Sequence, residues 1–219
     1  MKRPIKSLTV KSLGVICLYL ITTGAYGTVA PNGAYVHSIP IEVPPGLNGI
    51  QPTLAVEYNS ASIGTDSYVG MSWNLSGLAA IQRVNVGNGI KYAGQDSFMS
   101  PEGLLIANGD GSYSSLNQNF SRYVPQGQCG DSFCSWVVYL SNGTKQYYGS
   151  TMDSRISAPI QPASARAWAL SKVENPQGLY YEVEYFSAGD GNYYPLRISY
   201  TKGAGAYYHV IKFEYAAKS

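Results

Sequence analysis

Pairs of residues that favour tight hairpin turns recur along the whole chain. Asparagine precedes glycine at positions 32, 48, 88, 108 and 142, and aspartate precedes glycine at positions 110 and 190. Such pairs accept the positive backbone angles that two-residue hairpin turns require. Turn signals at this spacing predict many short antiparallel strands, and they leave little room for long helices.

The segments between these turns alternate apolar and polar residues. Leu54, Val56 and Tyr58 alternate with polar or small neighbours, and residues 181–185 and 211–215 follow the same pattern. A period of two places one set of side chains on a buried face and the other in solvent. Residues 136–140 are apolar throughout, which predicts a central strand covered on both faces. The chain is therefore predicted to be all-β, an antiparallel sandwich or barrel-like scaffold with little helix.

A short helical turn near residues 163–169 is the one exception that the pattern allows. Residues 96–130 are polar but are interrupted by apolar side chains, which predicts hairpins with long loops and a possible subdivision of the domain there.

The N-terminus has the features of a secretory signal peptide. It has a basic start, an apolar run over residues 13–21, and small residues at Ala25 and Gly27. This pattern predicts cleavage after Gly27 and export through the secretory pathway, to the cell surface or the medium, with the periplasm as the alternative. Residues 28–219 then form the domain. They keep 11 basic against 13 acidic residues, so no basic surface for nucleic acid is predicted. They contain no apolar run near the roughly 20 residues that a membrane helix needs, so no stable membrane insertion is predicted.

Two cysteines remain after such cleavage, Cys129 and Cys134. In an oxidising compartment they are predicted to form one disulfide that closes a tight loop. A zinc site would need further ligands, and His37 and His209 lie near opposite ends of the domain. No metal ion or other cofactor is predicted.

No motif indicates catalysis strongly. The chain has no Gly-x-Ser-x-Gly nucleophile motif. Glu182 and Glu184 form a Glu-x-Glu pair on a predicted strand, as in some ADP-ribosyltransferases, but charged residues also alternate on the wet face of any amphipathic strand. The abundant tyrosines offer a second alternative, carbohydrate binding by stacking, although cross-strand aromatic packing explains them as well. No catalytic residue and no small-molecule substrate are predicted.

Several ordered segments carry a resemblance to a known family. They are residues 33–60, Val69-Gly-Met-Ser-Trp-Asn-Leu-Ser-Gly-Leu, Ile81-Gln-Arg, Asn142-Gly-Thr to Asp153-Ser-Arg-Ile, Trp168-Ala-Leu-Ser, and Tyr194-Pro-Leu-Arg-Ile. These runs resemble the N-terminal region of the SpvB and TcaC/TcdB family of bacterial toxin proteins, which is associated with Rhs and YD repeats. The resemblance extends over nearly all of residues 28–219.

The resemblance implies a β-rich, non-enzymatic scaffold without the toxic domain, either complete in itself or the front part of a larger toxin. It also implies protein partners, namely a toxin shell, YD-repeat segments or other toxin components. Residues 33–49 and the strand after Val210 are the expected docking edges. The residues assigned to the scaffold through the family motifs are Gly33, Pro44, Pro45, Gly46, Tyr58, Trp73, Leu75, Gly77, Arg83, Asp153, Arg155, Trp168, Pro195 and Arg197.

Overall fold

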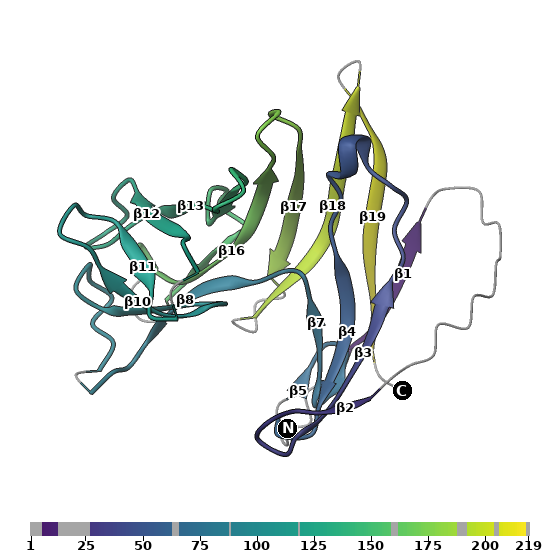
Figure 1. The fold of residues 1–219 in the computed structure, drawn as a ribbon, viewed down its shortest axis with the longest axis horizontal. Coiled ribbons are helices and arrows are strands. Elements are labelled where there is room, and N and C mark those ends of the chain that lie inside the picture. Colours follow the sequence, from purple (N-terminus) through teal and green to yellow (C-terminus); the bar gives the residue numbers. More distant parts are fainter. Residues whose placement is uncertain are drawn as a thin grey trace.

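The computed structural model describes residues 6–12, 27–62, 66–87, 89–117, 119–158, 162–187, 192–203 and 206–217. Within these residues the regular elements are strands, apart from one short 3-10 helix, η1 (Leu47–Gly49). The all-β prediction is confirmed (Figure 1). The strands are β1 (Lys6–Ser12), β2 (Thr28–Val29), β3 (Tyr35–Ile41), β4 (Leu54–Asn59), β5 (Asp66–Ser67), β6 (Gly70–Met71), β7 (Trp73–Ser76), β8 (Ala80–Val84), β9 (Ser97–Ser100), β10 (Gly103–Ala107), β11 (Tyr113–Ser115), β12 (Arg122–Gln126), β13 (Ser135–Tyr139), β14 (Lys145–Tyr148), β15 (Arg155–Ser157), β16 (Ala165–Glu174), β17 (Tyr180–Ser187), β18 (Tyr193–Gly203) and β19 (Ala206–Ala217).

The strands from β8 to β14, together with β16, close into an antiparallel barrel. Each of these strands pairs with the next along the chain, and β14 pairs with β16. The ring closes where β16 pairs with β8, with Trp168 opposite Ile81. This barrel forms the left lobe of Figure 1. A barrel of eight strands is just wide enough for side chains to fill its interior.

Aromatic side chains fill that interior. Trp136 and Trp168 are fully buried, and their ring centroids lie 5.8 Å apart. The fully buried Phe98 lies 5.1 Å from the ring of Trp136 and 5.7 Å from that of Trp168. Tyr113 adds a fourth ring, 5.2 Å from Trp136. These edge-to-face and tilted contacts are the favoured geometries for aromatic pairs, so the barrel has a solid core.

The second part of the fold is a two-layer sandwich that grows from the same strand, β16. The second half of β16 pairs with β17, and the sheet continues through β18 and β19 to β1. A separate sheet with the order β2-β3-β4-β7 lies across β18 and β19 (Figure 1). Its buried residues Leu54 and Leu75 belong to the same core cluster as Ile198 and Ile211 of the large sheet.

Polar contacts fix the small sheet on the large one. The Tyr200 hydroxyl donates to the carbonyl oxygen of Pro44 (2.8 Å), and the Leu47 amide donates to Oγ1 of Thr201 (3.2 Å). At the other end Tyr68 packs edge-on against Tyr194 and Tyr215, with centroids 5.8 and 5.9 Å apart. Tyr68 lies between β5 and β6, which pair with each other just before β7, so tyrosines at both ends hold the connections of the small sheet against the large one.

Two local predictions are wrong. Trp136 and Val138 of β13 are buried, but Tyr139 on the same strand is 42% exposed, so residues 136–140 do not form a strand covered on both faces. The barrel interior covers one face of β13 and solvent reaches the other. Residues 165–169 belong to β16 and not to a helical turn, because both edges of this segment are paired, with β15 and with β8. The predicted hairpins between residues 96 and 130 are confirmed as β9 to β12.

The predicted signal peptide falls mostly outside the described residues. Within it, the backbone of Lys6–Ser12 forms β1, which pairs with β19. No helix in the described part of the chain is long and apolar enough to cross a membrane.

Buried tyrosines predict a loss of stability in alkali. Burial raises the pKa of Tyr181 to about 12 and that of Tyr185 well above 10. Below pH 10 both hydroxyls are protonated in the folded and the unfolded chain, so stability does not change. Above pH 10 only the unfolded chain ionises, and the free energy of unfolding falls by roughly 1 kcal/mol per pH unit for each tyrosine. Urea unfolding midpoints at pH 8, 10 and 11 measure this effect. Tyr181→Phe is expected to flatten the decline, and equal midpoints at pH 8 and 11 would contradict the assignment.

Candidate functional site

Arg83, the arginine of the Ile81-Gln-Arg motif, is buried and links several segments of the barrel. Its guanidinium forms an ion pair with Asp96 (Nη1 to Oδ2, 2.7 Å), and both side chains are at most 4% exposed. Nη1 also donates to the Ala93 carbonyl (2.7 Å), Nε to the Ala165 carbonyl (2.7 Å) and Nη2 to Oγ of Ser132 (2.5 Å). Burial lowers the pKa of Arg83, and the charge of Asp96 opposes that shift. The arginine thus joins β8 to β16 and to two loops.

The predicted disulfide between Cys129 and Cys134 is present. Its loop carries Ser132, the hydroxyl that accepts from Arg83. The indole Nε1 of Trp168 donates to the Cys134 carbonyl (3.1 Å), and Nη1 of Arg155 lies 3.7 Å from the sulfur of Cys129. The bridge therefore shapes a loop that contacts the barrel core.

The Asp-Ser-Arg motif holds the turn before β15. Arg155 Nε donates to the Gly149 carbonyl (2.7 Å), and Oδ2 of Asp153 accepts from the Tyr185 amide (2.8 Å). The second contact ties this turn to β17. Arg155 thus holds the turn itself, and Asp153 joins the turn to the open sheet.

Other motif residues meet close backbone contacts or pack in the core. A Cβ at Gly46 would lie 2.1 Å from the Ile50 carbonyl oxygen, and one at Gly77 would lie 2.0 Å from the Thr53 carbonyl oxygen. Gly77 also has a φ of +92°, a conformation that L side chains rarely adopt. Leu75 is buried.

The remaining motif residues occupy turns, strand pairs or ring contacts. Gly33 has a positive φ of +81°, and the rings of Tyr58 and Trp73 are in contact. The carbonyl of Pro44 accepts from the Tyr200 hydroxyl, and Pro45 follows it in the same loop. The carbonyl of Pro195 accepts from the Tyr215 hydroxyl, and Arg197 forms an ion pair with Glu184. The motif residues are dispersed through the fold and do not converge on one pocket.

Both carboxylates of the Glu-x-Glu pair, the alternative ADP-ribosyltransferase motif, contact side chains on other strands of the same sheet. Oε1 of Glu184 lies 2.7 Å from Nε and from Nη2 of Arg197 on β18. The carboxylate of Glu182 accepts from the hydroxyl of Tyr207 on β19. Both glutamates stand on the outer face of the open sheet. This placement is the one expected for an amphipathic strand.

The histidines are strand residues on separate sheets. His37 lies on β3, and the ring of His209 on β19 lies 5.1 Å from that of Tyr200. Among the described residues, no group of three or more histidines, cysteines and acids lies close enough together to hold a metal ion.

One end of the small sheet exposes an apolar surface, which we call the aromatic tip and define as Val29, Tyr35, His37, Ile39, Tyr58 and Trp73. Register places Val29 opposite Tyr35, and His37 opposite Tyr58, which is itself opposite Trp73. Val29 is 72% exposed, and Tyr35 and Ile39 are each 46% exposed.

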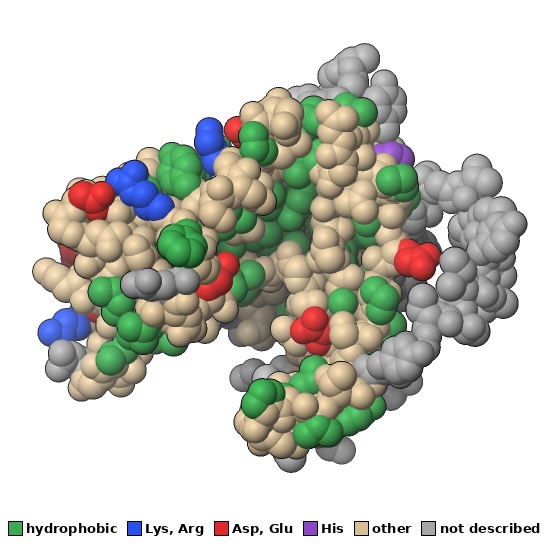
Figure 2. All heavy atoms as spheres, viewed as in Figure 1, with side chains coloured by type: hydrophobic (Ala, Val, Ile, Leu, Met, Phe, Trp, Pro, Cys, Tyr) green, Lys and Arg blue, Asp and Glu red, His purple; other side chains and the backbone are tan. Residues whose placement is uncertain are grey.

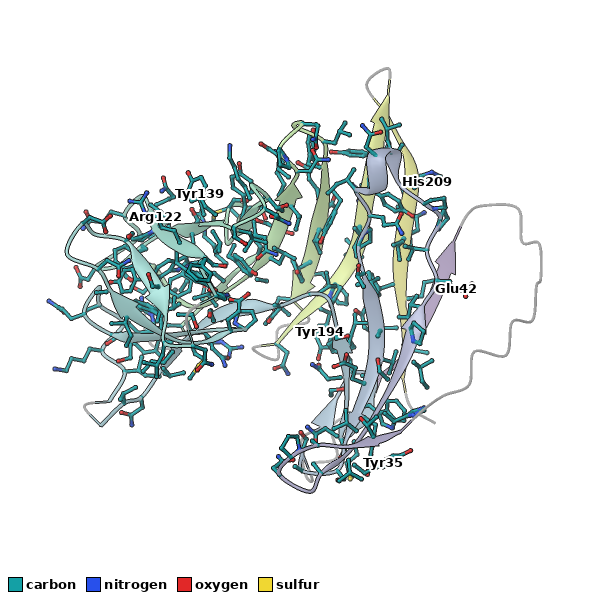
Figure 3. The ribbon with its side chains drawn as sticks, in the orientation of Figure 1. Tyr35, Glu42, Arg122, Tyr139, Tyr194 and His209 are labelled. Atoms are coloured by element: carbon teal, nitrogen blue, oxygen red, sulfur yellow. A yellow bond between two sulfur atoms is a disulfide. The ribbon has the colours of Figure 1, made fainter. Side chains whose placement is uncertain are left out.

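The rings of the aromatic tip form a continuous row. Tyr58 lies 5.4 Å from Trp73 and 6.2 Å from Tyr35, and His37 lies 6.2 Å from Trp73. Nδ1 of His37 is buried without a hydrogen-bond partner among the described residues. Hydrophobic side chains are visible at the lower end of this sheet in Figure 2, and Tyr35 is labelled there in Figure 3. The sequence predicted residues 33–49 as a docking edge and Tyr58 and Trp73 as scaffold residues. It did not predict the row of rings, because these residues are brought together only by the pairing of β3, β4 and β7.

The chain is thus an all-β module in which a closed barrel and a two-layer sandwich share one strand, β16. The motif residues stabilise this fold through their turns, hydrogen bonds and packing. Residues 29–123 match the model of the family described as Salmonella virulence plasmid 65kDa B protein, SpvB. This part of the chain is therefore similar to the SpvB family, the family that the sequence motifs indicated. No match was found among curated proteins.

The fold is similar to parts of solved toxin structures. The crystal structure of TcdB2-TccC3-TEV matches with a TM-score of 0.76 at 20% identity, over 95% of this chain and 12% of that chain. The Photorhabdus luminescens Tc holotoxin pore matches with a TM-score of 0.68 at 22% identity, over 81% and 10%. The N-terminal domain of effector protein SpvB from Salmonella typhimurium strain LT2 matches with a TM-score of 0.62 at 19% identity, over 77% and 65%. The present chain thus spans about a tenth of the Tc toxin chains.

Proposed function

We propose that the chain is a secreted, non-enzymatic scaffold module of a bacterial virulence toxin of the SpvB and Tc type, which packs against further β-shell or YD-repeat protein. The observation that carries this proposal is the match of residues 29–123 to the SpvB family, within a fold that recurs as a small part of much longer chains. In those chains the corresponding fold is a small part of a long polypeptide, the rest of which is available to contact it. Protein partners are therefore the natural occupants of an exposed apolar surface on this module.

The aromatic tip supplies such a surface. Its exposed residues lie on a sheet face that is buried further along, at Leu54 and Leu75. An apolar sheet face that continues beyond its own core is typical of a surface completed by a neighbour. Export rests on the basic and apolar pattern of residues 1–27.

The enzymatic alternative gains no support from the site. Glu182 and Glu184 are engaged by Tyr207 and Arg197 on an open sheet face. We expect no NAD hydrolysis by the purified protein. Hydrolysis that is abolished by Glu184→Gln would overturn the non-enzymatic assignment.

Sequencing the DNA on both sides of the reading frame, followed by co-expression, tests the scaffold proposal. We expect an adjacent coding segment for β-shell or YD-repeat protein, and we expect its product to co-purify with this chain. The double variant Tyr35→Ser/Ile39→Ser is expected to reduce co-purification at least tenfold. Ile106→Ser on the outer face of the barrel is the matched control, since Ile106 is 45% exposed. The proposal fails if no such segment exists, or if its product does not bind.

A further inference from the structure

The outer edge of β19 carries a strand that the sequence predicts to be removed. Lys6–Ser12 pairs with β19 in antiparallel register over seven residues, from Lys6 opposite Ala217 to Ser12 opposite Ile211. All seven residues of β1 precede the cleavage site predicted after Gly27. Removal of residues 1–27 would leave the matching stretch of β19 without a partner on that side.

The remaining contacts of β19 do not depend on β1. Its first half pairs with β18, from Gly203 opposite Ala206 to Arg197 opposite Lys212. Its second half is anchored by side chains that point into the molecule. Phe213 is 3% exposed, and the Tyr215 hydroxyl donates to the Pro195 carbonyl (2.7 Å). These contacts keep β19 in place when its outer edge is open.

That edge lacks most of the features that protect edge strands from pairing. β19 is twelve residues long and contains no proline, and its buried residues Ile211 and Phe213 alternate with the exposed Lys212 and Glu214. Long, regular edge strands are templates for the addition of another strand. One lysine and one glutamate, of opposite sign, give this edge only weak protection.

The residues of β19 define what a partner strand has to present. Lys212 is exposed, so an acidic residue directly opposite it would form a favourable cross-strand pair. Phe213 is buried and Tyr215 is half-buried, so apolar residues opposite them would follow the apolar pattern of β19.

We infer that the outer edge of β19 is a strand-accepting site. In the processed protein it takes an antiparallel strand of about seven residues from the partner polypeptide, with apolar residues opposite Phe213 and Tyr215 and an acidic residue opposite Lys212. In the uncleaved chain Lys6–Ser12 occupies this site and blocks it. The inference rests on the proposed scaffold function, and it names the contact that export and cleavage expose.

The test uses the full chain with a site for a sequence-specific protease inserted after Gly27, so that the protein folds before cleavage. A fluorescent peptide with the sequence of residues 6–12, and a second one carrying Lys11→Glu, are titrated before and after cleavage. We expect no binding before cleavage and saturable binding after it. The Lys11→Glu peptide is expected to bind roughly two- to fivefold more tightly.

Charge reversal on the protein provides the matched control. In the Lys212→Glu variant the preference should reverse, so that the unaltered peptide binds more tightly than the Lys11→Glu peptide. N-methylation of alternate peptide residues gives a second control, because only one of the two alternate sets of amides faces β19 in an antiparallel pair. One methylated peptide should bind and the other should not.

Several outcomes would overturn the inference. They are equal binding before and after cleavage, equal binding of both methylated peptides, or loss of the near-ultraviolet circular dichroism on cleavage, which would make β1 an integral part of the fold. Dimerisation of the cleaved chain without peptide binding would assign the edge to a second copy. None of these outcomes alters the co-purification test on the aromatic tip, so the two proposals fail separately.

Discussion

Replacing Arg83 with methionine is expected to lower the free energy of unfolding by about 3 to 5 kcal/mol, the range typical for breaking a buried ion pair by removing one partner. The substitution leaves Asp96 charged and buried, and it leaves the carbonyls of Ala93 and Ala165 and the hydroxyl of Ser132 without their donor. The loss of these contacts loosens the join between β8, β16 and the disulfide loop. Urea unfolding followed by tryptophan fluorescence measures the change.

Arg122→Met is the matched control for this experiment. Arg122 also forms an ion pair, with Asp110 at 2.9 Å, but both side chains are more than half exposed. Its loss is expected to cost less than about 1 kcal/mol, as for other exposed pairs. Equal effects of the two substitutions would show that Arg83 is not a structural centre. The double variant Arg83→Met/Asp96→Leu should be less destabilised than the sum of its single variants, because it removes both buried charges.

Replacing Trp168 with alanine is expected to lower the free energy of unfolding by about 3 to 5 kcal/mol, as for other large-to-small changes in a core. The side chain is fully buried, and its ring contacts those of Phe98 and Trp136. The guanidinium carbon of Arg83 lies 5.3 Å from the ring centroid, so the change also removes a cation-π contact. The Cys134 carbonyl loses the indole donor as well.

Tyr139→Ala on β13 serves as the control for Trp168. Tyr139 is an aromatic residue of the same barrel, but it is 42% exposed on the outer face. Its substitution is expected to cost about 1 kcal/mol or less, as is usual for surface changes away from special features. The prediction for Trp168 fails if both variants unfold at the same urea concentration.

Local features predicted several hairpins correctly. The turn between β13 and β14, at the Asn142-Gly143 pair, is an example, because the Asn142 side chain accepts from the amide of Thr144 within the turn itself. The disulfide was predictable for a related reason, since Cys129 and Cys134 are only five residues apart. Such features depend on neighbours along the chain, and the sequence displays those neighbours directly.

The errors arose where burial depends on distant segments. Residues 136–140 are uniformly apolar, yet solvent reaches one face of β13, since the barrel closes on the other. Arg83 was recognised through a family motif, but its partners were not. Asp96 is 13 residues away and Ala165 is 82 residues away, and no local pattern connects them. The row of rings at the aromatic tip was missed because it depends on the register of three strands.

The sequence by itself determined the fold class, several hairpin turns, the disulfide and the resemblance to the SpvB family, because turn chemistry, alternation and motif order depend on residues that are close along the chain. The tertiary structure alone decided that β16 pairs with β8 to close a barrel, which face of each strand is buried, and which edge of the sheet is covered by β1. The physical reason is the same in each case. A strand presents two faces and two edges, and only segments far away in the chain determine which of them meet protein and which meet water.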